Sequence, residues 1–335
     1  MSCTRVRVAV VGAGIAGLAA ARTLRDEGFV VQVLERGRGV GGRTAHRRTD
    51  VHHFDHGAQY FTARDPRFVR HVEAWVEAGL VARWKGRIVA LKGNAAASPV
   101  TPFDRYVGVP GMDAMAKHLA QGIDVTVKCD VIALSRDAGA WSLATRAGGR
   151  LGPFNALIVA VPPEQATRLS LPTELLDATK GVELLPCWCA MAAFGSPLAV
   201  DFDGAFVNGA VLDWIARDSS KPGRPEGERW VIHASAQWSA ERLADPPDAI
   251  ARALLGHFFD ALGLSPHEPE HLAGHRWSFA RPTHEGQSDC LWLADPAVAL
   301  CGDWCRGGRV EGAYLSGVAA AGRVVGATAV HQGIG

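Results

Sequence analysis

The sequence has no excess of either charge and no hydrophobic run long enough to cross a membrane. Its 335 residues include 35 Lys and Arg against 34 Asp and Glu, so the net charge of +1 gives no electrostatic reason to expect a nucleic-acid partner. The apolar stretch that begins at Val6 is too short for a membrane span and is interrupted by Arg7. We therefore expect no signal peptide, no membrane anchor and a cytoplasmic protein.

The sequence also lacks a disulfide framework and a metal-binding pattern. Its seven cysteines are an odd number spread over the whole chain, at positions 3, 129, 187, 189, 290, 301 and 305, which is typical of reduced thiols. His52, His53 and His56 lie close together, but no recognised ligand spacing accompanies them. They predict a polar loop and no metal site.

A dinucleotide-binding fingerprint occupies the N-terminal segment. An apolar strand ending at Val11 leads into Gly12-Ala13-Gly14-Ile15-Ala16-Gly17. The first glycine of such a pattern allows a tight turn, the second lets the backbone approach a pyrophosphate, and the third lets the helix pack on the strand. The Ala- and Leu-rich run that follows predicts a helix over 15–27, which ends at Gly28 and directs its N-terminal N–H groups at the diphosphate.

A second apolar strand, over 30–34, places Glu35 at its carboxyl end. A carboxylate there accepts hydrogen bonds from both ribose hydroxyls, which argues against a 2′-phosphate and hence against NADP in this pocket. The fingerprint alone leaves NAD and FAD open, because both carry the same adenosine and pyrophosphate.

The segment after Glu35 favours FAD. It reads Arg36-Gly37-Arg38-Gly39-Val40-Gly41-Gly42-Arg43-Thr44 and resembles the second phosphate-contacting motif of FAD-dependent amine-oxidase-type flavoproteins. A glycine-lined loop lets backbone N–H groups reach the diphosphate, and Arg43 can add a charge-assisted hydrogen bond. A flexible surface loop is the alternative for this segment taken alone. Arg36, Gly42 and Arg43 are predicted to contact the cofactor.

Three later segments resemble the same flavoproteins and imply further contacts with FAD. The resemblance implies that Phe54-Asp55-His56-Gly57-Ala58-Gln59-Tyr60-Phe61 passes along the flavin ring, with contacts from Gly57 to Phe61, and that the backbone of Val131 meets adenine. It also implies that Asp303 binds the ribityl chain or the pyrophosphate. A helix that begins at Val310-Glu311-Gly312-Ala313 would direct N–H groups at the flavin pyrimidine and stabilise its reduced form.

The predicted fold class is α/β, with a Rossmann-like FAD-binding domain of the amine-oxidase type interleaved with a mixed α+β substrate domain on an antiparallel sheet. Residues 1–61, 107–163 and 290–335 are assigned to the FAD-binding domain, and residues 62–106 and 164–289 to the substrate domain. Within the latter, alternation over 230–236 predicts a strand and the pattern over 248–262 an amphipathic helix.

Several segments, not only in the cofactor motifs, resemble the bacterial renalases. They are residues 58–65, 219–224 and 301–305 and the triplet His275-Arg276-Trp277. The resemblance implies an oxidase that returns wrong-position isomers of NADH or NADPH to NAD⁺ or NADP⁺, with O2 becoming hydrogen peroxide. Its partners would be a dinucleotide substrate and O2. Because a dihydropyridine that loses hydride becomes aromatic directly, the reaction needs no general base.

Aromatic side chains suit a flat ring stacked over the flavin, and Tyr60, His233 and Trp277 are the candidates to face the substrate. Core packing is the alternative for each of them. The run Lys221-Pro222-Gly223-Arg224 predicts a turn whose basic pair is a further candidate to meet substrate phosphates.

We expect non-covalent FAD, because no cysteine follows Trp277 at the position that covalent relatives use. Two other functions stay open at this stage. One is an amine oxidase or related flavin dehydrogenase, and the other is a non-enzymatic flavin-binding redox sensor. The oligomeric state is not indicated by the sequence.

Overall fold

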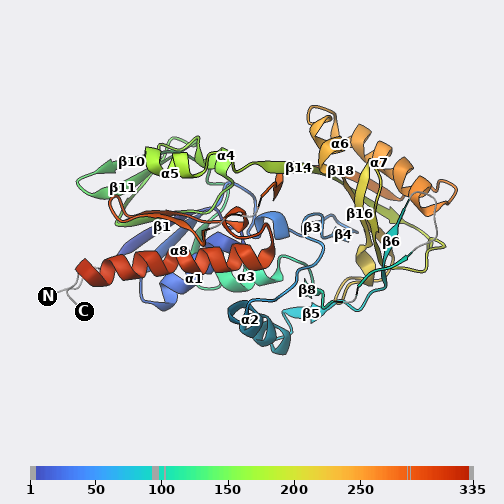
Figure 1. Ribbon diagram of the computed structural model, residues 1–335, viewed down its shortest axis with the longest axis horizontal. Coiled ribbons are helices and arrows are strands. Elements are labelled where there is room, and N and C mark those ends of the chain that lie inside the picture. Colours follow the sequence, from blue (N-terminus) through green and yellow to red (C-terminus); the bar gives the residue numbers. More distant parts are fainter. Residues whose placement is uncertain (1–4, 93–97, 102, 285, 287, 332–335) are drawn as a thin grey trace.

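Two large β-sheets organise the chain, which passes between them several times (Figure 1). The computed structural model describes residues 5–92, 98–101, 103–284, 286 and 288–331, so Cys3 lies outside the described residues. The first and last described elements of the chain, its N-terminal strand and C-terminal helix, both belong to the layers around the six-stranded sheet (Figure 1). This arrangement is the predicted Rossmann-like unit combined with an antiparallel sheet.

The six-stranded sheet has the order β19-β20-β13-β1-β2-β9. Its strands are β1 (Arg7–Val11), β2 (Val30–Leu34), β9 (Asp124–Thr126), β13 (Ala156–Val159), β19 (Leu291–Leu293) and β20 (Val298–Leu300). All pairs are parallel except β19 with β20, and Val11 lies between Leu34 and Val159 in register. The loops that follow β1, β2, β13 and β20 therefore meet at one edge, where open α/β sheets bind ligands.

Both faces of this sheet are covered, which explains the nearly continuous apolar character of β1. Val8 and Val10 pack beneath the helices α1 (Ile15–Asp26), α3 (Ala114–Ala120) and α8 (Val310–His331). Ala9 and Val11 pack against a three-stranded sheet of β10 (Val131–Asp137), β11 (Ala140–Thr145) and β12 (Arg150–Phe154). The short helices α4 (Pro163–Ala166) and α5 (Thr173–Ala178) complete that side.

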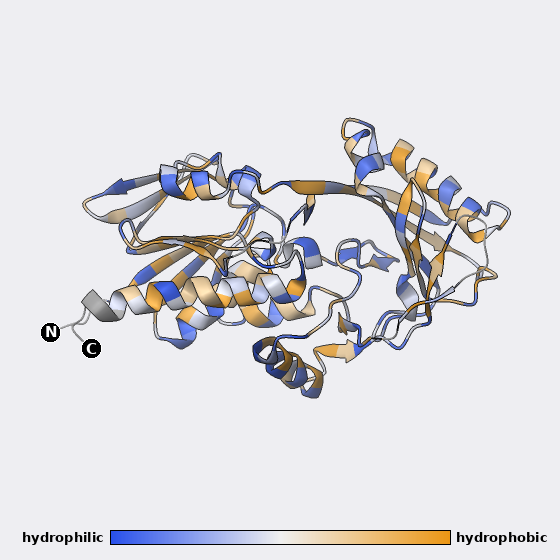
Figure 2. Ribbon diagram, viewed as in Figure 1, coloured by the Kyte–Doolittle hydropathy of each residue, from blue (hydrophilic) through white to orange (hydrophobic). Residues whose placement is uncertain are grey.

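The seven-stranded sheet has the order β18-β14-β17-β16-β15-β6-β7 and is antiparallel except for the pair β15 and β6. Its strands are β6 (Ile88–Leu91), β7 (Ser98–Pro99), β14 (Leu184–Phe194), β15 (Gly204–Val207), β16 (Leu212–Arg217), β17 (Glu228–Ala234) and β18 (His271–Pro282). The long strand β14 is hydrophobic along its length and reaches from this sheet toward the other (Figure 2).

Two helices cover the outer face of the seven-stranded sheet, α6 (Ala236–Ala240) and α7 (Pro247–Leu262) (Figure 1). The apolar side of α7 packs Leu254 and Phe258 into one core with Trp188 and Trp230. The helix ends at Gly263, whose φ of +65° is the left-handed conformation that favours glycine. The predictions of a helix over 248–262 and a strand near 230–236 are confirmed.

The remaining elements connect the two sheets. They are α2 (Pro66–Glu77), the pairs β3 (Arg47–Arg48) with β4 (His53–Phe54) and β5 (Val81–Arg83) with β8 (Tyr106–Gly108), and three short 3-10 turns, η1 (Gly42–Thr44), η2 (Asp218–Ser220) and η3 (Asp303–Cys305). None of the helices in the described ranges has the length and apolar character that a membrane crossing requires.

Candidate cofactor and substrate site

A cavity of about 1040 Å³ begins at the carboxyl edge of the six-stranded sheet and extends to the seven-stranded sheet. Residues from β1, β2, β10, β14, β17 and β18 all contribute to its wall. Its volume is at the upper end of the range for small-molecule and cofactor sites. Its dimensions therefore suit a large ligand.

The glycines of the fingerprint shape the sheet end of this cavity. Gly12 has a φ of +103°, and a Cβ on Gly17 would lie 2.0 Å from the carbonyl oxygen of Gly12. These two positions need glycine for the turn and for helix packing, as the pattern predicts. Gly14 and Ala16 line the cavity, and a Cβ on Gly14 would have no atom within 4 Å. The space beside Gly14 is therefore open to a ligand.

Glu35 lies at the end of β2 and lines the same cavity, as does Arg36. Its Oε2 accepts a 2.8 Å hydrogen bond from the backbone N–H of Ala13, and its Oε1 accepts a 2.6 Å bond from that of Gly37. A carboxylate has about four acceptor sites, so these two bonds orient the group and leave acceptor capacity for ribose hydroxyls.

Replacing Glu35 by Gln is expected to weaken FAD binding about tenfold, because a charge-assisted contact to the ribose is lost. The measurement is the FAD-to-protein ratio after gel filtration, followed by titration of the apoprotein with FAD. Glu27→Gln, at the exposed end of α1, is the matched control. Equal FAD affinity in the Glu35 variant and the control would refute the ribose assignment.

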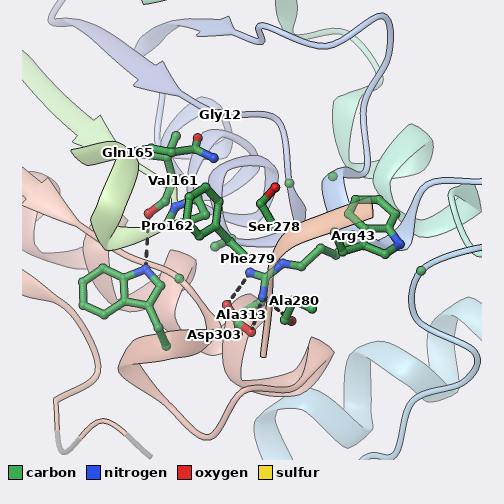
Figure 3. Close-up of a pocket in the computed structure, with 18 of the residues that line it drawn as sticks. Gly12, Arg43, Val161, Pro162, Gln165, Ser278, Phe279, Ala280, Asp303 and Ala313 are labelled. Atoms are coloured by element: carbon green, nitrogen blue, oxygen red, sulfur yellow. Dashed lines mark hydrogen bonds and ion pairs between the residues drawn. The ribbon is translucent and has the colours of Figure 1, made fainter. Parts of the chain in front are cut away.

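Arg43 and Asp303 both line the cavity, and they are paired with each other (Figure 3). The Arg43 guanidinium bonds both carboxylate oxygens of Asp303, at 2.8 Å from Nη1 to Oδ2, and Nη1 also donates to the carbonyl of Ala280 at 3.0 Å. The sequence predicted two separate cofactor contacts. In the structure, Arg43 and Asp303 instead form one bidentate ion pair, which connects the loop after β2 to η3, the turn that precedes α8.

The N-terminus of α8 meets the cavity through Val310 and Ala313 but not through the residues between them. Glu311 faces the loop before α2, where its Oε1 accepts 2.7 Å hydrogen bonds from the N–H groups of Arg64 and Asp65. A Cβ on Gly312 would lie 1.8 Å from the carbonyl oxygen of Arg306. Glu311 and Gly312 are not among the lining residues, and their contact with the cofactor through backbone N–H groups stays a prediction.

The segment predicted to pass along the flavin ring divides into two parts. Gly57 and Ala58 line the cavity and Val131 does so at the opposite end. Gln59, Tyr60 and Phe61 are not among the lining residues. Gln59 bonds backbone carbonyls of its own loop, Tyr60 packs among Trp84, Phe103 and Trp214, and Phe61 is buried against Phe68 and Tyr106. Tyr60 thus contacts the cavity lining only through Trp214, and its assignment to the substrate stays a prediction.

The far end of the cavity is formed by side chains from four adjacent strands. Trp214 pairs with His233, and Cys189 pairs with both His233 and His275, so these residues form one row across β16, β17, β14 and β18. Trp277 follows His275 by two positions and therefore lies on the same face. We call Trp214, His233, His275 and Trp277 the substrate wall; all four line the cavity.

The carbonyl oxygen of His56 holds two members of the substrate wall. It accepts hydrogen bonds from Trp277 Nε1 at 2.9 Å and from His233 Nε2 at 3.2 Å. Because a carbonyl oxygen only accepts, Nε2 of His233 carries the hydrogen and its Nδ1 carries the lone pair. The His56 ring also packs on His275 and Trp277, with centroid distances of 4.6 and 5.0 Å. The sequence analysis placed His56 in a polar loop beside the flavin segment and gave it no contact with the substrate.

The imidazoles at this end are neutral near pH 7. Burial lowers the pKa of His56 to about 3 and the pKa values of His233 and His275 to about 4. The positive charge of Arg47 adds to the effect on His275. Burial also raises the pKa of the Cys187 thiol to about 12. The wall therefore offers hydrogen-bonding and stacking groups without a fixed charge.

The basic side chains of Lys221 and Arg224 are buried in ion pairs and are not accessible to a substrate phosphate. The side chains of Lys221 and Arg224 have no solvent exposure and pair with Asp55, while Lys221 Nζ also lies 2.7 Å from Asp218 Oδ1. The suggestion that they meet substrate phosphates is wrong. Within the described ranges the six cysteines are free, and no group of three or more His, Cys, Asp or Glu is arranged to hold a metal ion.

Comparisons with known proteins agree with this geometry. Residues 10–75 match the family described as NAD(P)-binding Rossmann-like domain, and residues 94–325 match the one described as Flavin containing amine oxidoreductase. A segment of 62 residues is 45% identical to an L-glutamate oxidase precursor from Streptomyces diastatochromogenes and covers 18% of this chain but only 9% of that protein.

Solved structures show the same fold over nearly the whole chain. A putative protoporphyrinogen oxidase from Exiguobacterium sp. 255-15 has a TM-score of 0.75 at 14% identity, covering 96% of this chain and 98% of that one. A putrescine oxidase bound to putrescine has a TM-score of 0.74 at 14% identity, covering 96% and 99%.

The family matches thus place the chain among the FAD-dependent oxidoreductases with a Rossmann-like nucleotide site, and the fold is consistent with that class. More specifically, the chain belongs to the flavin-containing amine oxidoreductase family, whose match covers well over half of its length.

Proposed function

We propose that this chain is an oxidase of isomeric dihydronicotinamide dinucleotides, converting wrong-position NADH or NADPH isomers to NAD⁺ or NADP⁺. When bound, FAD supplies the hydride acceptor, and its reoxidation by O2 yields hydrogen peroxide. The observation that carries the proposal is the substrate wall, in which two indoles and two neutral imidazoles close one end of the cavity. A flat dihydropyridine stacks on such side chains.

The residues present fit a cofactor and a substrate at opposite ends of the cavity. The open backbone at Gly14, together with Glu35, suits the adenosine diphosphate half of FAD. We assign residues 1–61, 107–163 and 290–335 to FAD binding and residues 62–106 and 164–289 to the substrate. Non-covalent attachment is supported by the raised pKa of Cys187, a half-buried thiol that lines the cavity and stays protonated near pH 7.

The charge of the cavity lining supports an anionic substrate. Its charged side chains comprise seven arginines, at 36, 43, 146, 168, 276, 281 and 309, and four carboxylates, at 35, 130, 213 and 303. This gives an excess of three positive charges (7 − 4), of which a FAD diphosphate would balance about two. Such a lining attracts a second diphosphate more readily than an ammonium ion.

Oxidation of a carbon–nitrogen bond in an amine is the second candidate, and the comparisons favour it over the first. The family is described as an amine oxidoreductase, and one structural neighbour binds putrescine. Asp213 also lines the cavity, 3.9 Å from Arg281, and could hold an amine. An ammonium substrate must lose a proton before hydride leaves, and His233 Nδ1 would be the acceptor.

Anaerobic mixing separates these candidates. The oxidised, FAD-loaded protein is mixed in turn with isomer-containing NADH, with pure β-NADH and with simple amines including putrescine, while the visible flavin band is followed. We expect bleaching by the isomer-containing sample within seconds and little by pure β-NADH. Bleaching by an amine alone would establish the second candidate, and no bleaching by any sample would indicate a flavin-binding redox sensor.

A further inference from the structure

The loop that carries His56 is held by two buried polar side chains, Gln59 and Lys221, which are hydrogen-bonded to each other and which we call the clamp. Gln59 Nε2 donates to the carbonyl oxygens of Asp55 and Gly57, which flank His56. Gln59 Oε1 in turn accepts a 3.0 Å hydrogen bond from Lys221 Nζ. Because Lys221 directly follows η2, between β16 and β17, the clamp connects this loop to the seven-stranded sheet.

The position of the clamped loop determines the orientation of two wall residues at once. The His56 carbonyl between the two clamped carbonyls accepts from His233 on β17 and Trp277 on β18, two strands separated by β14. Close packing leaves little freedom, since a Cβ on Gly57 would lie 2.0 Å from the carbonyl oxygen of Arg43 and 3.2 Å from the Trp277 ring. A small shift of the loop would therefore break both hydrogen bonds.

We propose that Gln59 and Lys221 are positioning residues for the substrate wall. Acting through the His56 carbonyl, they keep His233 in its Nε2–H tautomer. Because His233 lines the cavity, its Nδ1 is then available as a hydrogen-bond acceptor. Nδ1 then accepts an N–H of the substrate, which is the carboxamide N–H of a dihydronicotinamide. That last step rests on the proposed function, whereas the tautomer does not.

The buried charges around Lys221 support a positioning role for the clamp over a purely stabilising one. Asp55, Asp218, Lys221 and Arg224 have no exposed side-chain surface, so each has lost the hydration of its charge. Apolar residues of the same volume commonly give equal or greater stability than such buried pairs. What an apolar cluster cannot supply is the directed contact from Lys221 Nζ to the Gln59 amide.

The decisive variant is Gln59→Met, which keeps the length of the side chain and removes its three hydrogen bonds. Long-range ¹H–¹⁵N spectra of the FAD-loaded protein report the tautomer of His233, identified by the signal missing from His233→Asn. We expect the Nε2–H form in the wild type, a tautomer mixture in Gln59→Met, and loss of the hydrogen-bonded shift of the Trp277 indole. KM for the isomeric substrate should rise about tenfold, with kcat affected less.

Gln237→Met, at an exposed position of α6, is the matched control and should leave the spectra and KM unchanged. Should Gln59→Met not fold, Gln59→Asn, whose amide is too short to span both carbonyls, is measured in its place with the same expectation. A variant that loses stability but keeps the His233 tautomer and the Trp277 shift would overturn the proposal. Failure of the wild type to oxidise the isomers would overturn only the proposed function, because the spectra need no substrate.

Discussion

A Gly17→Val variant is expected to fold poorly and to lose FAD. A Cβ at this position would lie 2.0 Å from the carbonyl oxygen of Gly12 and 3.1 Å from the Cβ of Ala160. Neither contact can be relieved by rotating a side chain, so α1 must move away from β1 and β13. Overpacking of this kind costs about 3 kcal/mol, a large fraction of the net stability of a domain. The displaced helix would also withdraw its N-terminal N–H groups from the diphosphate.

Urea denaturation of the apoprotein and FAD titration measure the two consequences separately. Gly14→Ala is the matched comparison, because a Cβ there meets nothing within 4 Å and its φ of −74° suits any residue. We expect Gly14→Ala to retain the apoprotein stability while binding FAD at least about tenfold more weakly, since the new methyl group would occupy ligand space. Normal FAD affinity in both variants would contradict the assignment of this turn to the cofactor.

The fingerprint could be read from sequence because its constraints are local. The turn at Gly12, the helix beginning at Ile15 and the end of that helix before Gly28 all depend on residues within one β-α-β unit. Backbone conformation and hydrophobic periodicity determine such a unit, and both are visible in the order of residues. The strand over 30–34 and its terminal Glu35 were predicted at the same positions for this reason.

The substrate end could not be predicted in the same way. Trp214, His233 and His275 are adjacent only because four strands pair in one register, and strand pairing over such separations leaves no local signal. Tyr60 and Trp277 looked equivalent as aromatic candidates in the sequence. The structure separates them, because Trp277 lines the cavity and donates to the His56 carbonyl, whereas Tyr60 is not a lining residue and packs among Trp84, Phe103 and Trp214.

The turn at Lys221 shows a second limit. Its composition of Lys, Pro, Gly and Arg is typical of an exposed loop, yet Lys221 and Arg224 are fully buried. Asp218 in the same turn balances one of these two charges, and burial of the second becomes favourable only because Asp55, which is distant in sequence, also pairs with them. The partner, and not the segment itself, determines whether such a turn faces solvent.

Replacing Lys221 by Met is expected to destabilise the protein by about 3–5 kcal/mol at pH 7, because Asp55 and Asp218 would remain buried with one cation fewer. Burial alone would raise the pKa of Asp55, but Lys221, His46 and Arg224 outweigh it and hold that pKa well below its usual range. In the wild type this stabilisation is present above the unfolded pKa and is lost only as the pH falls toward the lower folded value.

The variant should show the opposite trend. With Lys221 absent, protonation of a buried carboxylate becomes favourable, so the deficit in unfolding free energy should shrink between pH 7 and pH 5. Urea titrations at both pH values measure this, with Lys180→Met as the control, since Lys180 forms an exposed pair with Asp177. The double variant Lys221→Met with Asp218→Asn removes one charge of each sign and should recover part of the loss. A deficit that is independent of pH and unchanged in the double variant would mean that Lys221 contributes through packing and not through its charge.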